Sequence, residues 1–126
     1  MKEFATNSMI GEGLLKPVLD ERKSRLHVEF LDEVTSTRVP ALRRELLAIL
    51  NSHQRVEWKF LYMDMRNCRM IDSMGLNWLF AELVRLKKSG REMVIRISSP
   101  AINRVMEFAG LDKLVTVKFR RRKQTR

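Results

Sequence analysis

The residues best suited to chemistry lie in one short stretch, Ile71-Asp72-Ser73-Met74-Gly75-Leu76. Ser73 offers a hydroxyl group, and Asp72 places a carboxylate directly beside it. A mostly apolar strand is predicted over residues 58–65, and a helix is predicted to begin at Ser73 and run to about Lys88. The first N–H groups of a helix lack partners within the helix and carry partial positive charge. An oxygen or a phosphate held at that point is therefore stabilised.

Two interpretations of Ser73 follow from this position. Ser73 is either the structural N-cap of the helix, where its hydroxyl contributes about 1 kcal/mol, or an exposed group that a partner recognises or modifies. Gly75 bears on this choice, because a glycine inside a helix costs about 1 kcal/mol relative to alanine. Its presence indicates a close approach, either by a neighbouring strand or by an incoming partner.

The sequence gives no support for a catalytic site, a metal site or a cofactor site. No Gly-rich phosphate loop is present, and no general base is predicted beside Ser73. His27 and His53 lack further ligands at metal-binding spacing, and His27 falls on the polar side of its strand. We therefore expect no enzyme activity, no metal, no cofactor and no tight nucleotide binding. The chain is predicted to act by being bound.

Length and composition indicate a single domain with an ordinary core. No apolar run is long enough to span a membrane, and the first residues do not resemble a signal peptide. Cys68 is the only cysteine, which favours a reducing, cytoplasmic location and a packing role for this side chain. Six basic residues and no acid lie between Lys118 and Arg126, so residues 1–117 carry only +4 of the net charge of +10.

Strands alternating with helices predict an α/β fold with a largely parallel sheet. Residues 14–19 and 25–31 are expected to form an antiparallel hairpin, with Pro17 placing its strand at the sheet edge. A helix is predicted after Thr37 as N-cap, with Glu45 facing outward. Residues 92–97 and 115–119 are the remaining strands, with a helix between them that Ser99 caps and Gly110 ends. We expect a mixed four- to five-stranded sheet with three or so helices mainly on one face.

Several of these residues together resemble the signature of the STAS domain family. Asp64-Met65, followed after a short turn by Ile71 to Leu76, is similar to the Asp-Leu and Asp-Ser-x-Gly-Leu motifs of that family. Phe30-Leu31-Asp32, Ser99-Pro100-Ala101 and Gly110-Leu111-Asp112-Lys113 match as well. The resemblance implies a STAS-like domain over residues 14–119, preceded by a flexible leader (1–13) and followed by a basic tail (120–126).

The members that the chain most resembles are bacterial anti-sigma-factor antagonists. The resemblance implies that Ser73 is phosphorylated by a partner that is both anti-sigma factor and Ser kinase. The unphosphorylated form binds that kinase and frees the sigma factor, and a Ser/Thr phosphatase resets the switch. The residues implied in partner binding are Asp32, Asp72, Met74, Gly75 and Leu76.

This sequence departs from the family pattern at several positions. Glu29 stands where the family usually has Gly, so the chain is expected to bend differently there. Arg66 and Arg69 flank the serine motif and Arg38 lies near the other loop, which indicates a more acidic partner or pairing with phosphate. We expect no direct DNA binding. The basic tail is expected either to be solvated or to contact an acidic partner or anionic lipid.

Other functions stay open at this point. The first is a STAS subunit that docks on a membrane transporter or a lipid-export ATPase. The second is a domain in which Ser73 is only a cap and the tail binds nucleic acid. An enzyme that uses the acidic loop is the least supported alternative.

Overall fold

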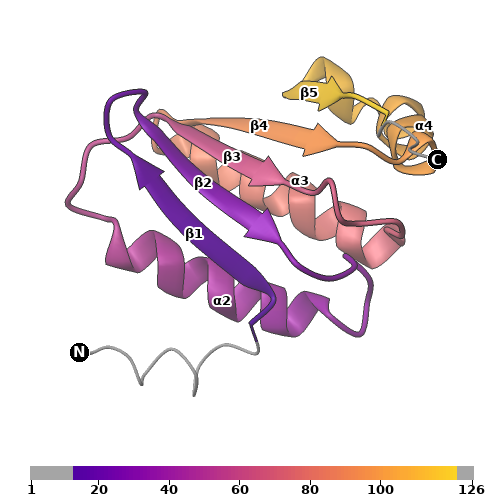
Figure 1. The fold of residues 1–126 in the computed structure, drawn as a ribbon, viewed down its shortest axis with the longest axis horizontal. Helices are drawn as coiled ribbons and strands as arrows, with labels where there is room; N and C mark the ends of the chain where they lie inside the picture. Colours follow the sequence, from indigo (N-terminus) through magenta and orange to yellow (C-terminus); the bar gives the residue numbers. More distant parts are fainter. Residues whose placement is uncertain (1–12, 122–126) are drawn as a thin grey trace, which may run out of the picture.

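The computed structural model describes residues 13–121, and the predicted leader (1–13) and tail (120–126) lie mostly outside this range. The described chain alternates strands and helices (Figure 1). Its elements are β1 (Leu15–Asp20), β2 (Arg25–Phe30), α2 (Val39–Ser52), β3 (Phe60–Asp64), α3 (Ser73–Lys88), β4 (Glu92–Ile97), α4 (Pro100–Ala109), the 3-10 helix η1 (Leu111–Lys113) and β5 (Thr116–Phe119).

The strands form one mixed sheet in the order β1-β2-β3-β4-β5. β1 and β2 are antiparallel, and each later neighbour pairs in parallel. β1 is an edge strand, which confirms the prediction from Pro17. β2 continues through Glu29, which pairs in register with Asp64 of β3.

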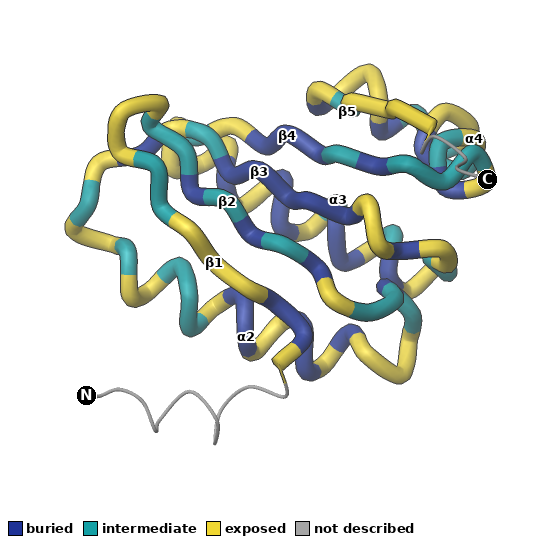
Figure 2. The backbone as a smooth tube through the Cα atoms, viewed as in Figure 1, coloured by how far each residue is buried: buried dark blue, intermediate teal, exposed yellow. Residues whose placement is uncertain are grey.

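The core lies between one face of the sheet and the helices (Figure 1). Every second residue of β2 points into this core and is fully buried. His27 lies on the opposite face of the sheet and stacks on Tyr62. In the described part of the chain no helix covers that opposite face (Figure 1). Figure 2 shows the burial concentrated in the central strands β3 and β4. Because β2, β3 and β4 run parallel, their carboxyl ends lie together at one side of the sheet.

The structure corrects two local predictions in α2. Arg38 is the N-cap residue and makes no side-chain capping bond, so Thr37 is not the cap. Glu45, predicted to face outward, is buried because its carboxylate accepts the backbone N–H groups of Leu14 and Leu15 at 3.1–3.2 Å. This carboxylate satisfies donors at the start of an edge strand.

The predicted caps of α4 are confirmed. Ser99 accepts a hydrogen bond from the Ile102 N–H, and Gly110 ends the helix in the left-handed region, with φ 79°. Cys68 is buried, as predicted, and burial raises the pKa of its thiol to about 12. Over residues 13–121, no helix is both long and apolar enough to cross a membrane.

Candidate functional site

Two loops meet at the carboxyl ends of β2 and β3, and we call them, with the first turn of α3, the two-loop site. Residues 31–38 follow β2, and residues 65–72 follow β3. Val34 and Ile71 form a parallel bridge, in which the Val34 N–H donates to the Met70 carbonyl and the Asp72 N–H donates to the Val34 carbonyl. These backbone bonds fix one loop against the other.

Glu33 adds a side-chain clamp to this backbone pairing. One oxygen of its carboxylate accepts the N–H groups of Arg69 and Met70, at 2.7 and 2.8 Å. Backbone donors that would otherwise face solvent or an apolar neighbour are thereby satisfied. The sequence analysis missed Glu33, because its partners are 36 and 37 residues away and no local spacing marks them.

Gly75 is buried beneath the first loop and makes this packing possible. A Cβ atom at this position would overlap the Val34 carbonyl oxygen and lie 2.9 Å from its carbonyl carbon. The close approach predicted from this glycine is therefore internal, to a loop rather than to a strand. Gly75 is buried, so it offers little surface to a partner, and its structural role is to let the two loops pack closely.

Asp72, and not Ser73, is the N-cap of α3. The Asp72 carboxylate accepts the Gly75 N–H at 2.8 Å and, across the loops, the Ser36 N–H at 2.7 Å. These two bonds, that of Gly75 first, hold the pKa of the Asp72 carboxyl below its ordinary value. The cap interpretation of Ser73 is wrong, because the preceding residue already fills that role.

Ser73 occupies the first position of α3 and is exposed. Among residues 13–121, nothing accepts or donates a hydrogen bond at its hydroxyl, and the N–H groups of Ser73 and Met74 also lack partners there. Two backbone N–H groups without partners among residues 13–121 thus lie beside an exposed hydroxyl at the start of a helix. Such an arrangement can accept an added phosphate without breaking an existing contact.

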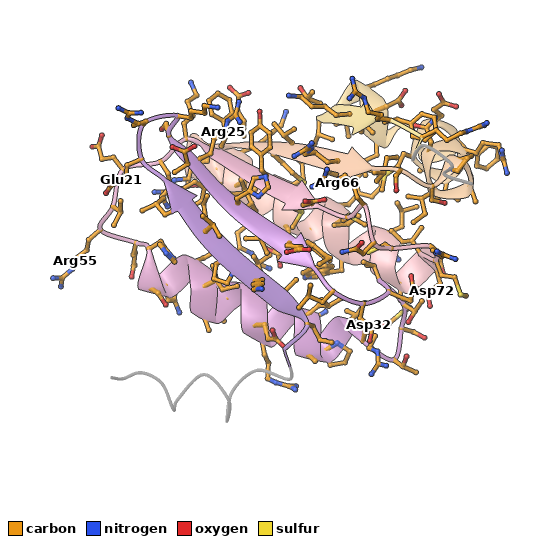
Figure 3. The ribbon with its side chains drawn as sticks, viewed as in Figure 1. Glu21, Arg25, Asp32, Arg55, Arg66 and Asp72 are labelled. Atoms are coloured by element: carbon orange, nitrogen blue, oxygen red, sulfur yellow. The ribbon has the colours of Figure 1, made fainter. Side chains whose placement is uncertain are left out.

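Asp32 lies at the same end of the molecule as Asp72 (Figure 3). One Asp32 oxygen accepts the Glu33 N–H at 2.7 Å, and the other pairs with Arg38 Nε at 3.0 Å. The Cys68 thiol donates to the Asp32 carbonyl at 3.1 Å. Arg38 is thus paired internally, and the two predicted aspartates lie on two loops at the same end of the molecule.

A further acid, Asp64, is the last residue of β3 and is almost fully buried. Arg66 Nε and Nη2 donate to its two oxygens at 2.8 and 2.7 Å. Burial by itself raises the pKa of the Asp64 carboxyl, but the hydrogen bonds and charge of Arg66 outweigh burial and lower it. Asp64 therefore stays ionised and anchors the turn after β3.

Apolar side chains extend the exposed surface beyond Ser73. Met74 is 53% exposed, and Leu76 lines a hollow of about 780 Å³ together with α4. Phe108 on this hollow is 98% exposed. The sequence analysis did not single out Phe108, although a phenylalanine off the predicted apolar stripe of its helix is a signal for such a surface. The structure thus joins α3 and α4 in one partly apolar face.

The described residues contain no group of three metal-ligating side chains. The two-loop site offers instead an exposed hydroxyl, two fixed carboxylates and an adjacent apolar face.

Comparisons with known proteins agree with this architecture. Residues 16–125 match the STAS domain family. An anti-sigma factor antagonist from Mycobacterium paratuberculosis has a similar structure, with a TM-score of 0.66 and 21% identity, over 82% of this chain and 85% of that one. The anti-sigma factor antagonist SpoIIAA in its unphosphorylated form has a TM-score of 0.58 and 10% identity, over 86% and 89% of the two chains. The mixed five-stranded sheet with helices mainly on one face is the fold of these antagonists. Because the family match extends over most of the sequence, the chain belongs to the STAS domain family.

Proposed function

We propose that this protein is a phosphorylatable binding module in partner switching. In its unphosphorylated form it binds an anti-sigma factor that is also a Ser kinase, and so releases a sigma factor. Phosphorylation of Ser73 blocks that binding, and a Ser/Thr phosphatase restores it. The fold shared with two anti-sigma factor antagonists supports this proposal.

The observation that carries the proposal is the exposed Ser73 hydroxyl, which has no hydrogen-bond partner among residues 13–121. The start of α3 is fixed by Asp72, which binds N–H groups from both sides of the site. A phosphate at Ser73 adds a charge of about −1.5 to −2 at neutral pH. Next to Asp72, this charge would change the surface that a partner meets without unfolding the domain.

The partner surface consists of Asp32 and Asp72, with Met74 and Leu76 as apolar contacts. Gly75 contributes from beneath by keeping the two loops in place. The exposed Phe108 extends the apolar part of the same surface across α4. A partner that buries Met74 and Phe108 also approaches Ser73, so a phosphate there would interrupt the contact. The module itself needs no catalytic group, and we propose that it works in the cytoplasm.

The test compares Ser73→Ala and Ser73→Asp with the wild type, by measuring affinity for the cognate kinase side by side. Ser73→Ala should bind like the wild type and gain no mass on incubation with kinase and ATP. Ser73→Asp should bind at least tenfold more weakly, because its carboxylate imitates part of the phosphate charge.

Ser52→Asp is the matched control, because it adds the same charge at the far end of α2. That helix has 14 residues, about 20 Å in length, so its end lies well away from Ser73. Unchanged binding by Ser73→Asp, together with no phosphate on wild-type Ser73, would refute the proposed function.

A further inference from the structure

A second charged feature lies where β3, β4 and β5 end, beside the two-loop site. Two cavities of about 500 and 1030 Å³ share Arg66, Ser98 and Arg121 in their walls, and together they form what we call the basic groove. Its basic residues are Arg66, Arg69, Arg96, Lys118, Arg120 and Arg121. Among the described residues that line the two cavities, none is acidic.

Most of these cations form no salt bridge with the described acids, although the charge of Arg96 helps to lower the pKa of Asp64. Of these six cations, only Arg66 forms a salt bridge within residues 13–121, with Asp64. Lys118 lies over the Tyr62 ring, 5.3 Å from its centroid, and its amine is 3.4 Å from the Tyr62 hydroxyl. The described acids form no salt bridge with Arg69, Arg96, Arg120 or Arg121. Cations gathered in a hollow repel one another, and an anionic ligand would relieve that repulsion.

The backbone around the groove favours an anion as well. α4 begins at its wall, with Ser99 as N-cap and Pro100 at the first helical position, so the positive end of the helix dipole faces this region. The Ser98 hydroxyl donates to the Arg66 carbonyl at 2.8 Å and ties the β4–α4 connection to the β3–α3 loop. The arginines therefore stand on a fixed support.

We propose that the basic groove binds an acidic peptide segment of the protein that docks at Ser73. The groove and the serine share a support, because the loop that carries Arg66 and Arg69 leads directly into Asp72 and Ser73. The inference that this acidic segment belongs to the partner that docks at Ser73 rests on the proposed function. The inference that the ligand is acidic rests on the groove alone.

An extended acidic peptide fits the groove better than the other polyanions do. A lipid surface is broad and flat, whereas these cations line hollows. Single-stranded nucleic acid is held largely by stacking on aromatic rings. Within residues 13–121, Phe119 is the only aromatic residue that lines either cavity. Carboxylates spaced along an extended chain can meet arginines on several strand ends at once.

The experiment titrates the full-length chain into a fluorescein-labelled decaglutamate peptide and follows anisotropy. The triple variant Arg69→Gln, Arg96→Gln and Arg121→Gln should weaken binding at least tenfold. A control with the same loss of charge, Arg22→Gln, Lys23→Gln and Arg55→Gln, changes exposed residues outside the groove. It should weaken binding less than threefold. Melting temperatures of both triple variants establish that each is folded.

Further measurements separate the possible failures. Ser73→Asp should bind the peptide like the wild type, so loss of kinase binding by that variant leaves the groove untouched. Equal weakening by the two triple variants would mean a diffuse charge effect and would overturn the proposal. So would stronger, groove-dependent binding to phosphatidylserine vesicles or to a single-stranded oligonucleotide than to the peptide. Peptide binding at the groove with no kinase binding at Ser73 would uphold the groove and refute the proposed function.

Discussion

The two-loop site and the basic groove adjoin one another, yet their charged side chains differ in whether they have partners within the domain. In the two-loop site, Asp32, Glu33 and Asp72 each accept backbone N–H groups of the same chain. In the basic groove, Arg69, Arg96 and Arg121 find no salt-bridge partner among residues 13–121. The acids of the two-loop site stabilise the fold, whereas most of the arginines of the groove can pair with a ligand.

This difference shows how a charged residue in this protein can be interpreted. An ionised side chain with several internal hydrogen bonds supports the fold, whether or not a partner also contacts it, and its removal destabilises the fold. A cation without an internal partner contributes little to stability, and its removal should alter binding instead. Arg66 is the informative exception, because it lines the groove but is bonded to the buried Asp64.

The largest effect should come from Gly75→Ala. The added Cβ overlaps the Val34 carbonyl, which is held in place by the loop pairing, so the two loops must separate. Overpacking of this kind costs roughly 3 kcal/mol of unfolding free energy. Urea denaturation measures this loss. Asn77→Ala, on an exposed position of the same helix, is the control and should stay within about 0.5 kcal/mol of the wild type. A stable Gly75→Ala variant would show that the loop pairing is loose.

Arg66→Gln should have the next largest effect. It removes the charged bonds to Asp64 and should cost about 1–3 kcal/mol at neutral pH. Arg69→Gln is the control in the groove and should change stability by less than about 0.5 kcal/mol. If both variants lose equal stability, the distinction between scaffold and binding charges is wrong.

The pH dependence of Arg66→Gln gives a second measurement. In the wild type, the lowered pKa of Asp64 adds stability above the ordinary carboxyl pKa, and that stability is lost as pH falls through the lowered value. Without Arg66, burial is the main influence and favours the protonated carboxyl. The deficit of the variant should therefore shrink on acidification. A constant deficit between pH 7 and pH 3 would contradict this assignment.

The fold was largely predictable because its elements carry strong periodic patterns. α3 over Ser73–Lys88 and β4 over Glu92–Ile97 match the predicted bounds, since their apolar residues repeat at helical and strand spacing. The capping of α4 was predictable as well, because Ser99 and Pro100 are local signals.

The site was predictable only in part, because its contacts join distant parts of the chain. Asp72 and Ser73 are both common N-cap types, and the choice between them depends in part on the Ser36 N–H, 36 residues away. Burial of Glu45 depends on strand donors about 30 residues away. The grouping of arginines in the basic groove likewise required the strand order, since they come from several different elements.

Asp72→Asn should have a smaller effect than either of the first two changes at neutral pH. The amide oxygen can still accept one N–H, but the charge and the second bond are lost. The lowered pKa of Asp72 means that its contribution is present at neutral pH and is lost as pH falls through that lowered value. Stability curves for the two proteins should therefore converge below about pH 4. A gap that persists at pH 2 would assign the effect to shape rather than to charge.

The smallest effect should come from Ser73→Ala, within about 0.5 kcal/mol of the wild type. Its hydroxyl makes no hydrogen bond within residues 13–121, and alanine is a good helix former at an exposed position. Ser99→Ala is the matched comparison, because Ser99 also stands at a helix start but accepts the Ile102 N–H at 3.2 Å. That change should cost about 1 kcal/mol. Denaturation of both variants under one condition decides between a structural and a free hydroxyl. A loss at Ser73 as large as that at Ser99 would make Ser73 a structural residue, and would remove the main support for its role as a switch. Near-neutral stability together with lost phosphorylation would show that this serine serves the partner and not the fold.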